Sequence, residues 1–108
     1  MTKKAFWISY DLGIKGDFNS LYQWIDSHKG KECGNSVAYV TFSFQTDFIA
    51  ELKKNLEDNI ELKASDRIYI VYNDEGTEKT TGTFLFGNRK SAPWEGLAPS
   101  TTTPEDVL

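Results

Sequence analysis

Residues 4–11, KAFWISYD, carry apolar side chains on both of the alternating sets of positions that a β-strand presents. One set is Phe6, Ile8 and Tyr10, and the other is Ala5 and Trp7. Apolar residues on both faces are typical of a central strand that is covered on both sides. Residues 66–74, DRIYIVYND, show the same pattern, so we expect two such strands.

Two segments change to the 3.6-residue period of an amphipathic helix. The first is residues 17–29, where Asp17 is placed to cap the first turn and Gly30 offers a left-handed stop. The second is residues 47–58, with Asp47 or the preceding threonine as the cap. Both helices therefore begin with Asp-Phe after a strand and a short loop, which indicates two related halves.

Three further strands complete the pattern. GKECGNSVAYVTFSF predicts a short strand, a turn at Gly34 and a longer strand from about 36 to 44, and residues 80–87 predict a fifth strand. This order predicts an α+β fold, a ferredoxin-like βαββαβ sandwich with two helices on one sheet face and an extra C-terminal strand. We expect a single domain over residues 1–97 and a disordered, proline-containing C-terminal tail over residues 98–108.

The sheet face away from the helices also carries apolar residues, and it needs a cover. A second copy of the chain is the economical cover, because a self-complementary face meets its own copy across a two-fold axis. The sequence therefore predicts a homodimer.

Composition narrows the class of protein. A chain of 108 residues fits one domain, and its apolar runs are too short for a membrane span. MTKK leads directly into the first strand without the apolar stretch of a signal peptide, so the expected compartment is the cytoplasm. The single cysteine, Cys33, cannot form an internal disulfide, and with one histidine, His28, no Cys/His zinc site can be assembled. We expect Cys33 to be a small buried or half-buried residue and His28 to cap a helix.

Charge restricts any role with nucleic acid to a local patch. The net charge of −4 is opposite to the basic character expected of a protein that binds phosphates over its whole surface. Arg89 and Lys90 beside Trp94 are candidates for holding a nucleic-acid strand, with a solvated loop as the alternative. Lys15, in the Gly-rich turn GIKG, is a further candidate, because such a turn can direct backbone N–H groups at an anion; the alternative is an ordinary turn.

Asp11, at the end of the first strand, is the candidate catalytic and metal-binding residue. Mg²⁺ prefers oxygen ligands and usually takes one or two carboxylates together with water and substrate phosphate. Two copies of Asp11 near a two-fold axis would either share one cation or take up a proton. The alternative is that Asp11 caps the strand or bonds the backbone of the GIKG loop.

Four short stretches suggest a family. FWISYDLG (6–13) resembles the opening strand of the small CRISPR-associated adaptation subunit and of its relatives in the virulence-associated ferredoxin-like superfamily. GNSVAYV (34–40) resembles the hairpin strand of that superfamily, and DRIYIVY (66–72) resembles its fourth strand. APWEGLAP (92–99) is similar to a Trp-containing tail of uncharacterised cytoplasmic members.

The resemblance implies a homodimer in which the fifth strand pairs with the partner's sheet. It also implies that Asp11 holds a divalent metal, Mg²⁺, for phosphodiester cleavage. The first hypothesis is therefore a nucleic-acid-associated homodimer that acts as a metal-dependent endonuclease. The second is a non-catalytic dimeric interaction module that binds a protein or small ligand through an aromatic face. The SYDLG opening favours the first, whereas the net acidity and a first helix with Lys29 as its only basic residue favour the second.

Overall fold

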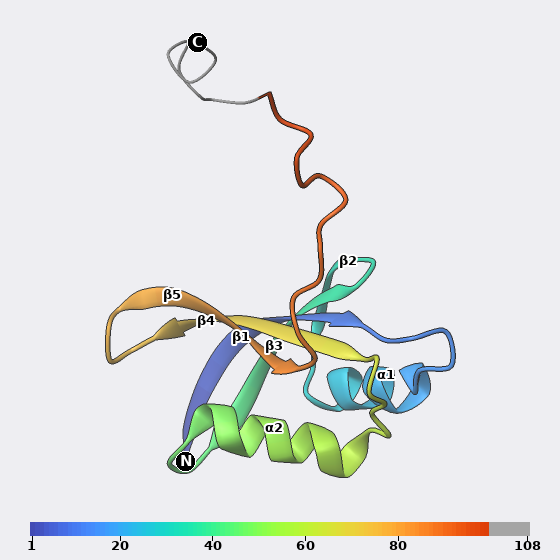
Figure 1. Cartoon of the computed structure of the whole chain (residues 1–108). Helices are drawn as coiled ribbons and strands as arrows, with labels where there is room; N and C mark the ends of the chain where they lie inside the picture. The colour runs from blue at the N-terminus through green and yellow to red at the C-terminus, as the bar shows by residue number, and fades with distance from the viewer. Residues whose placement is uncertain (100–108) are drawn as a thin grey trace.

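The structure is a computed structural model, and it describes residues 1–99. Its elements follow the order β-α-β-β-α-β-β, so the predicted α+β class is confirmed (Figure 1). They are β1 (Thr2–Asp11), α1 (Phe18–Ser27), β2 (Lys31–Gly34), β3 (Val37–Phe44), α2 (Phe48–Asn59), β4 (Arg67–Asp74) and β5 (Lys79–Phe86). All but the first two residues of the tail predicted over 98–108 lie outside the described residues.

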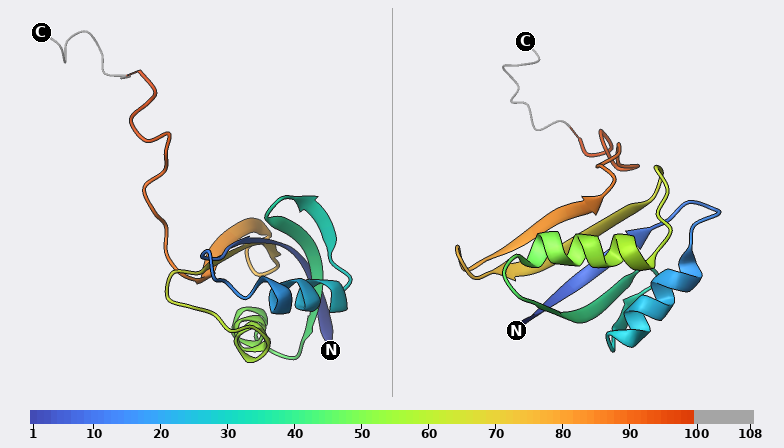
Figure 2. Two further views of the ribbon diagram at one scale, coloured as in Figure 1. Left: turned by 90° about the vertical axis from the view of Figure 1, so that its right-hand side faces the viewer. Right: turned by 90° about the horizontal axis from the view of Figure 1, so that it is seen from below.

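One antiparallel sheet holds the five strands in the order β2-β3-β1-β4-β5. β1 is the central strand, because Phe6 pairs with Val40 of β3 on one side and with Tyr72 of β4 on the other. Both helices lie on the same face of the sheet, so the domain has two layers (Figure 2). The face that α1 and α2 leave uncovered is called the open face below.

The core fills the space between the sheet and the two helices. Phe6 and Ile8 of β1 point into it with none of their surface exposed, as does Ile70 of β4. Leu21 of α1 and Leu52 of α2 belong to the same buried cluster. Full burial of one such side chain contributes about 1.5–3 kcal/mol, so this layer is the main source of stability.

The intervening residues of β1 face the opposite way. Trp7 is 46% exposed, and Ser9 and Asp11 are also exposed. No element within residues 1–99 covers them, so a cover for this face would have to come from a second copy, and that stays a prediction. The alternation of exposed and buried residues is that of an antiparallel strand with one solvated face.

β5 completes the sheet within the same chain. It runs antiparallel to β4, starting from the pair Asp74 and Lys79, after a connection formed by residues 75–78. The short connection accounts for this pairing, because antiparallel neighbours can be joined directly by a tight turn. The resemblance implies that the fifth strand pairs with the partner's sheet; β5 is an edge strand of the sheet in one copy, and its pairing with a partner stays a prediction. The two edge strands, β2 and β5, each pair with an irregular register.

Asp17 caps α1, as predicted. Its carboxylate accepts hydrogen bonds from the N–H of Glu61, at 3.0 Å, and from the N–H of Ser20, at 3.2 Å. It therefore ties the start of α1 to the segment that follows α2, and the bonds from Glu61 and Ser20 lower the pKa of Asp17. At the other end of α1, the left-handed conformation expected of Gly30 belongs to Lys29, with a φ of 57°.

Glu51 closes the N-terminus of α2. Its carboxylate accepts the N–H groups of Gln45 and Thr46 at 2.8 Å and of Asp47 at 2.7 Å. Asp47 is the N-cap, and its side chain accepts the N–H of Ala50 at 3.1 Å. The hydrogen bonds to Glu51, first of all the one from Gln45, lower the pKa of its carboxyl group. The two carboxylates thus satisfy backbone donors that lie at or before the start of the helix.

Replacing Glu51 with Gln should lower the melting temperature at neutral pH, because a neutral side chain accepts these hydrogen bonds less strongly. The pKa of Glu51 lies below its ordinary value of 4.5 in the folded chain. Ionised Glu51 therefore stabilises the fold fully above that value, and this stabilisation is lost as the pH falls through the lowered pKa. In thermal unfolding followed by circular dichroism, the parent should lose more stability than E51Q between about pH 5 and about pH 3. Equal losses would contradict the assignment.

Candidate functional site

Aromatic side chains gather on the open face. Trp7 of β1 and Tyr39 of β3 are cross-strand partners whose ring centroids lie 5.0 Å apart, with planes tilted by 54°. Tyr69 of β4 and Phe84 of β5 form a second cross-strand pair, 4.7 Å apart and edge to face. Tyr69 lies across Gly82 of β5, where a Cβ atom would collide with its ring. The face therefore presents two pairs of rings.

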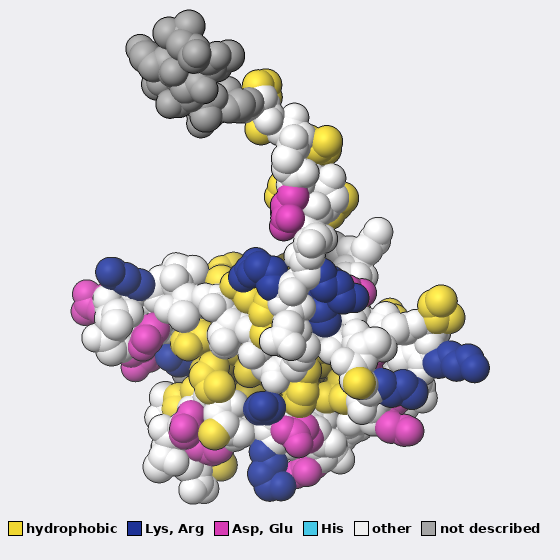
Figure 3. Space-filling model, viewed as in Figure 1, with side chains coloured by type: hydrophobic (Ala, Val, Ile, Leu, Met, Phe, Trp, Pro, Cys, Tyr) yellow, Lys and Arg dark blue, Asp and Glu magenta, His cyan; other side chains and the backbone are white. Residues whose placement is uncertain are grey.

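The strand residues of the open face carry mostly positive charge, although the whole chain has a net charge of −4. The register places Lys3, Lys31 and Arg67 on this face, and Asp11 is the one acidic residue among the strand positions that share it. Lys and Arg side chains flank the C-terminal segment where it leaves the sheet, and side chains of both charges lie around the helices and at the β4–β5 turn (Figure 3). The local charge is therefore opposite in sign to that of the chain.

Asp11 pairs with Arg67, its cross-strand neighbour on β4. The Oδ2 atom of Asp11 accepts hydrogen bonds from the Nε of Arg67, at 3.1 Å, and from its Nη2. The side chains of Asp11 and Arg67 are 59% and 25% exposed, so this ion pair lies at the rim of the sheet. Among the described residues, Asp11 makes no bond to the GIKG loop, and that alternative is wrong because the carboxylate reaches across to β4 instead.

The GIKG loop is held by another carboxylate, Asp66, which is 1% exposed. Its Oδ1 accepts the N–H of Gly13 and its Oδ2 accepts the N–H of Lys63, both at 2.8 Å. The Lys63 ammonium donates to the carbonyl of Lys15 at 2.7 Å. The chain's own carboxylate thus already occupies one of the backbone N–H groups that an external anion would use, and the anion-binding role of Lys15 stays a prediction.

A hollow of about 270 Å³ lies on the open face, and we call it the Asp11 pocket. Its lining residues are Ser9, Asp11, Arg67, Tyr69, Phe84 and Arg89. Arg89 lies over the Phe84 ring, with its guanidinium carbon 5.7 Å from the ring centroid. The pocket therefore combines a carboxylate, two guanidinium groups and two aromatic rings.

A larger hollow, of about 1060 Å³, runs beside β3 next to the helices, and we call it the β3-edge groove. Lys3 and Lys31 line it together with Lys29, so basic residues continue from the open face around the edge of the sheet. The groove also contains Glu51 and Asp58. Glu51 already accepts backbone N–H groups, and Asp58 pairs with a lysine one turn earlier on α2, so both acids are compensated.

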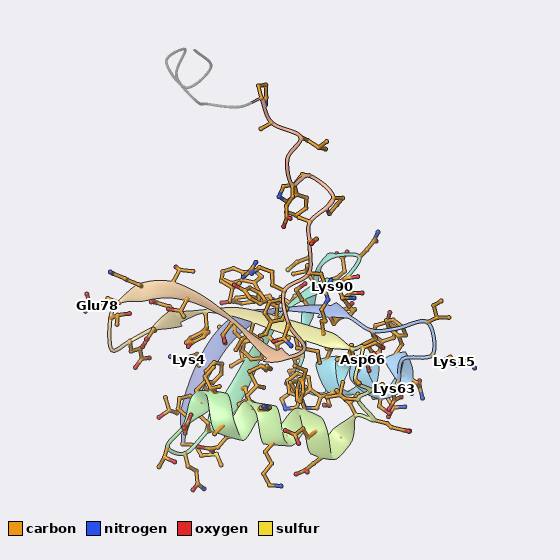
Figure 4. All side chains as sticks on the ribbon, in the orientation of Figure 1. Lys4, Lys15, Lys63, Asp66, Glu78 and Lys90 are labelled. Atoms are coloured by element: carbon orange, nitrogen blue, oxygen red, sulfur yellow. The ribbon has the colours of Figure 1, made fainter. Side chains whose placement is uncertain are left out.

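The predicted site residues come together only in part. Asp11 and Arg89 share the Asp11 pocket, whereas Lys90 and Trp94 do not line it. Trp94 is 72% exposed, and it belongs to a segment that runs away from the sheet (Figure 1). Lys15 lies in the β1–α1 loop, well apart from Lys90 at the base of that segment (Figure 4). Of the expected group of Arg89, Lys90 and Trp94, the pocket therefore includes Arg89 alone, because the chain turns away from the sheet after β5.

The donor set of one chain does not fit a magnesium site. Mg²⁺ needs several oxygen ligands, and Oδ2 of Asp11 is already engaged by Arg67. Within residues 1–99, no group of three or more His, Cys, Asp and Glu side chains converges. A site at Asp11 would need ligands from a second copy or from a bound substrate.

His28 and Cys33 have structural positions. His28 is the C-cap of α1, as predicted; its ring stacks on Trp24 at 4.1 Å, and its Nδ1 lies 2.8 Å from the Trp24 carbonyl oxygen, to which it donates. The prediction that Cys33 is buried is wrong, because β2 is a short edge strand and leaves the thiol exposed.

The comparisons add no family. No protein-family model, no curated protein and no solved structure matches the chain. The resemblance to the CRISPR-associated adaptation subunit stays a prediction that rests on the short motifs quoted above. Within residues 1–99, neither helix is long and apolar enough to cross a membrane.

Substitution of the two aspartates should separate their roles. Asp66→Asn should cost about 2–3 kcal/mol of unfolding free energy, because one backbone N–H would face an amide NH₂ in a buried position. Asp11→Asn should cost less than about 1 kcal/mol, because its ion pair is partly exposed. Urea unfolding followed by tryptophan fluorescence measures both values. A larger loss for Asp11→Asn than for Asp66→Asn would show that these assignments are reversed.

Proposed function

We propose that this chain is a ferredoxin-like domain with one added strand, and that it binds single-stranded nucleic acid on its open face. The sheet order and the placement of both helices on one face support the ferredoxin-like assignment. The observation that carries the function is the combination of exposed aromatic rings with local positive charge on one face of the sheet.

Unpaired bases bind such a face by stacking on its rings. Each stacked base contributes about 1–3 kcal/mol, largely independently of its identity. Small RNA-binding domains place aromatic residues on a four-stranded sheet for this purpose. Trp7 and Tyr39 occupy adjacent central strands here, and Trp7 offers the larger stacking surface because nearly half of it is exposed.

The sugar-phosphate backbone needs positive charge along its path. Arg67 and Arg89 lie at one end of the aromatic surface, and Lys3 and Lys31 lead from the other side into the β3-edge groove. A strand that crosses the sheet can therefore place its bases on the rings and its phosphates near these groups. Binding of Lys and Arg to the phosphates releases counterions from the nucleic acid, and this release is less favourable at higher salt concentration. The affinity should therefore fall as salt concentration rises.

Trp7→Ala should weaken binding of a fluorescein-labelled RNA of eight uridines by at least about fivefold, because one stacking surface is lost. Fluorescence anisotropy at fixed ionic strength measures the affinity. Tyr22→Ala is the matched control, because Tyr22 is a 51% exposed aromatic residue on α1, in the other layer. Its affinity should equal that of the parent. Failure of the parent to bind, or equal binding by the Trp7 variant, would refute the proposal.

A second copy of the chain is the alternative occupant of the open face. Ala5, Trp7 and Val71 make the middle of this face apolar, as in a subunit contact. The chain would then be a dimeric interaction module. Magnesium-dependent cleavage by Asp11 would need further ligands from that second copy or from a bound substrate, because one chain supplies too few.

Light scattering separates the two arrangements. We expect a mass of 12.3 kDa for the free chain at micromolar concentration, because the open face is then available to nucleic acid. Twice that mass, lowered to one copy by Trp7→Lys, would support the dimer instead. We also expect the parent and Asp11→Asn to leave the labelled RNA intact in the presence of Mg²⁺. Cleavage by the parent that is absent from the Asn variant would establish the nuclease.

A further inference from the structure

We infer that the Asp11 pocket receives one base of the bound strand and prefers guanine, an inference that rests on the proposed function. Its volume of about 270 Å³ lies just below the range of about 300–1,000 Å³ found for sites that enclose a whole small ligand. The pocket therefore has room for a planar base but not for a folded stretch of chain. It opens on the same face as the aromatic pairs, so a strand that crosses the sheet reaches it.

The pocket has aromatic surfaces against which a base can pack. Tyr69 and Phe84 line it, with their rings edge to face. One ring can therefore stack on the face of a base while the other contacts its edge. Gly82 is what allows Tyr69 to take this position, because any larger residue would collide with the ring. Ser9 is the small residue of β1 that lines the pocket.

Two polar groups remain available in the pocket. Arg67 engages Oδ2 of Asp11, whereas Oδ1 accepts no hydrogen bond from any described residue. Arg67 thus holds the carboxylate in place and leaves one acceptor for a ligand. Arg89 rests on the Phe84 ring, and no acceptor among the described residues bonds its guanidinium. The pocket therefore offers one fixed acceptor and one group of donors.

Guanine matches this pair of groups better than the other bases. Its edge carries the donors N1–H and N2–H beside the acceptor O6, with N7 as a second acceptor next to it. The donors fit Oδ1 of Asp11, and the acceptors fit the guanidinium of Arg89. Uracil supplies one donor, N3–H, between the acceptors O2 and O4, and so lacks the second donor of guanine. Adenine and cytosine have an amino group where guanine has O6, and it would face the donors of Arg89. The expected order is guanine, then uracil, then adenine and cytosine.

The test uses the full chain and four RNAs of eight nucleotides, uridine throughout except for one central position. That position is uridine, guanosine, adenosine or cytidine. Guanosine should tighten binding about tenfold relative to uridine, which is within the range for one well-placed base contact. Adenosine and cytidine should bind no more tightly than uridine. Fluorescence anisotropy at one salt concentration measures all four.

Asp11→Asn should abolish the preference for guanosine. The Asn oxygen would accept from Arg67, and its NH₂ would then face the base donors. The affinity for the all-uridine RNA should change less than about twofold, because stacking and phosphate contacts remain. Asp26→Asn is the matched control, since Asp26 is an exposed carboxylate on α1 that lines neither the Asp11 pocket nor the β3-edge groove. It should keep the full preference.

Arg89→Met tests the donor side without altering the sheet, because Arg89 follows β5 and lies outside the strands. The preference for guanosine should fall to less than about threefold. Lys90→Met removes the same charge from the next residue, which does not line the pocket, and it should keep the preference. If both variants lose affinity for all four RNAs to the same extent and both keep the guanosine preference, Arg89 acts through its charge alone. That result would contradict the inference.

The outcomes distinguish this inference from the function on which it rests. Binding of all four RNAs with equal affinity would overturn the guanine pocket and leave the open face as a nucleic-acid site. A guanosine preference that survives both Asp11→Asn and Arg89→Met would also overturn it, because another site would be reading the base. Binding of none of the RNAs would overturn the proposed function, and the inference with it.

Discussion

Two helices cover one face of the sheet, and the burial of that face constrains every other position on the strands. Phe6 and Ile8 must point inward to fill the core, so Trp7 must point outward. Tyr39 on β3 and Val71 on β4 are the cross-strand partners of Trp7, so they lie on the same outward face. A shift of one residue would exchange the two faces and expose the core, so the arrangement of the open face is as strongly determined as the core itself.

The acidic residues of the chain serve largely as acceptors for backbone N–H groups. Asp17 and Glu51 act at the starts of α1 and α2, and Asp66 anchors the turn before α1 while itself buried. Each replaces water around donors that the fold would otherwise leave free. Because these carboxylates lie with the helices and loops, a chain with a net charge of −4 can still present a positive surface on the opposite side of the sheet.

The sequence predicts the elements well because their periods are local. The central strands and both helices follow from spacings of two or of three to four residues, and β2 follows from the turn signal at Gly34. Asp17 is predicted as one N-cap, and Asp47 is one of two candidates for the other. Which face of the sheet is exposed to solvent is harder to predict. Trp7 is apolar and therefore indicates a covered face, but the spacing does not say whether the cover comes from this chain or from another.

The contacts of the site depend on distances along the chain that no local pattern reveals. Asp11 is separated from Arg67 by 56 residues, and their pairing requires the register between β1 and β4. Arg67, Tyr69 and Phe84 were therefore missed as site residues, although alternation along β4 places the first two on one face. Once that register is known, Asp11 and Arg67 are expected to be neighbours, and sequence alone could then suggest an ion pair.

The irregular edges of the sheet have a consequence for the solubility of the chain. β2 has four residues and a register shift against β3, and β5 has its own shift against β4 near Tyr69. A long, regular edge would be a template on which further strands could add, as in amyloid growth. These interruptions shorten that template at both ends. Lateral polymerisation through backbone pairing is thereby discouraged, and any encounter between copies is directed toward side-chain contacts.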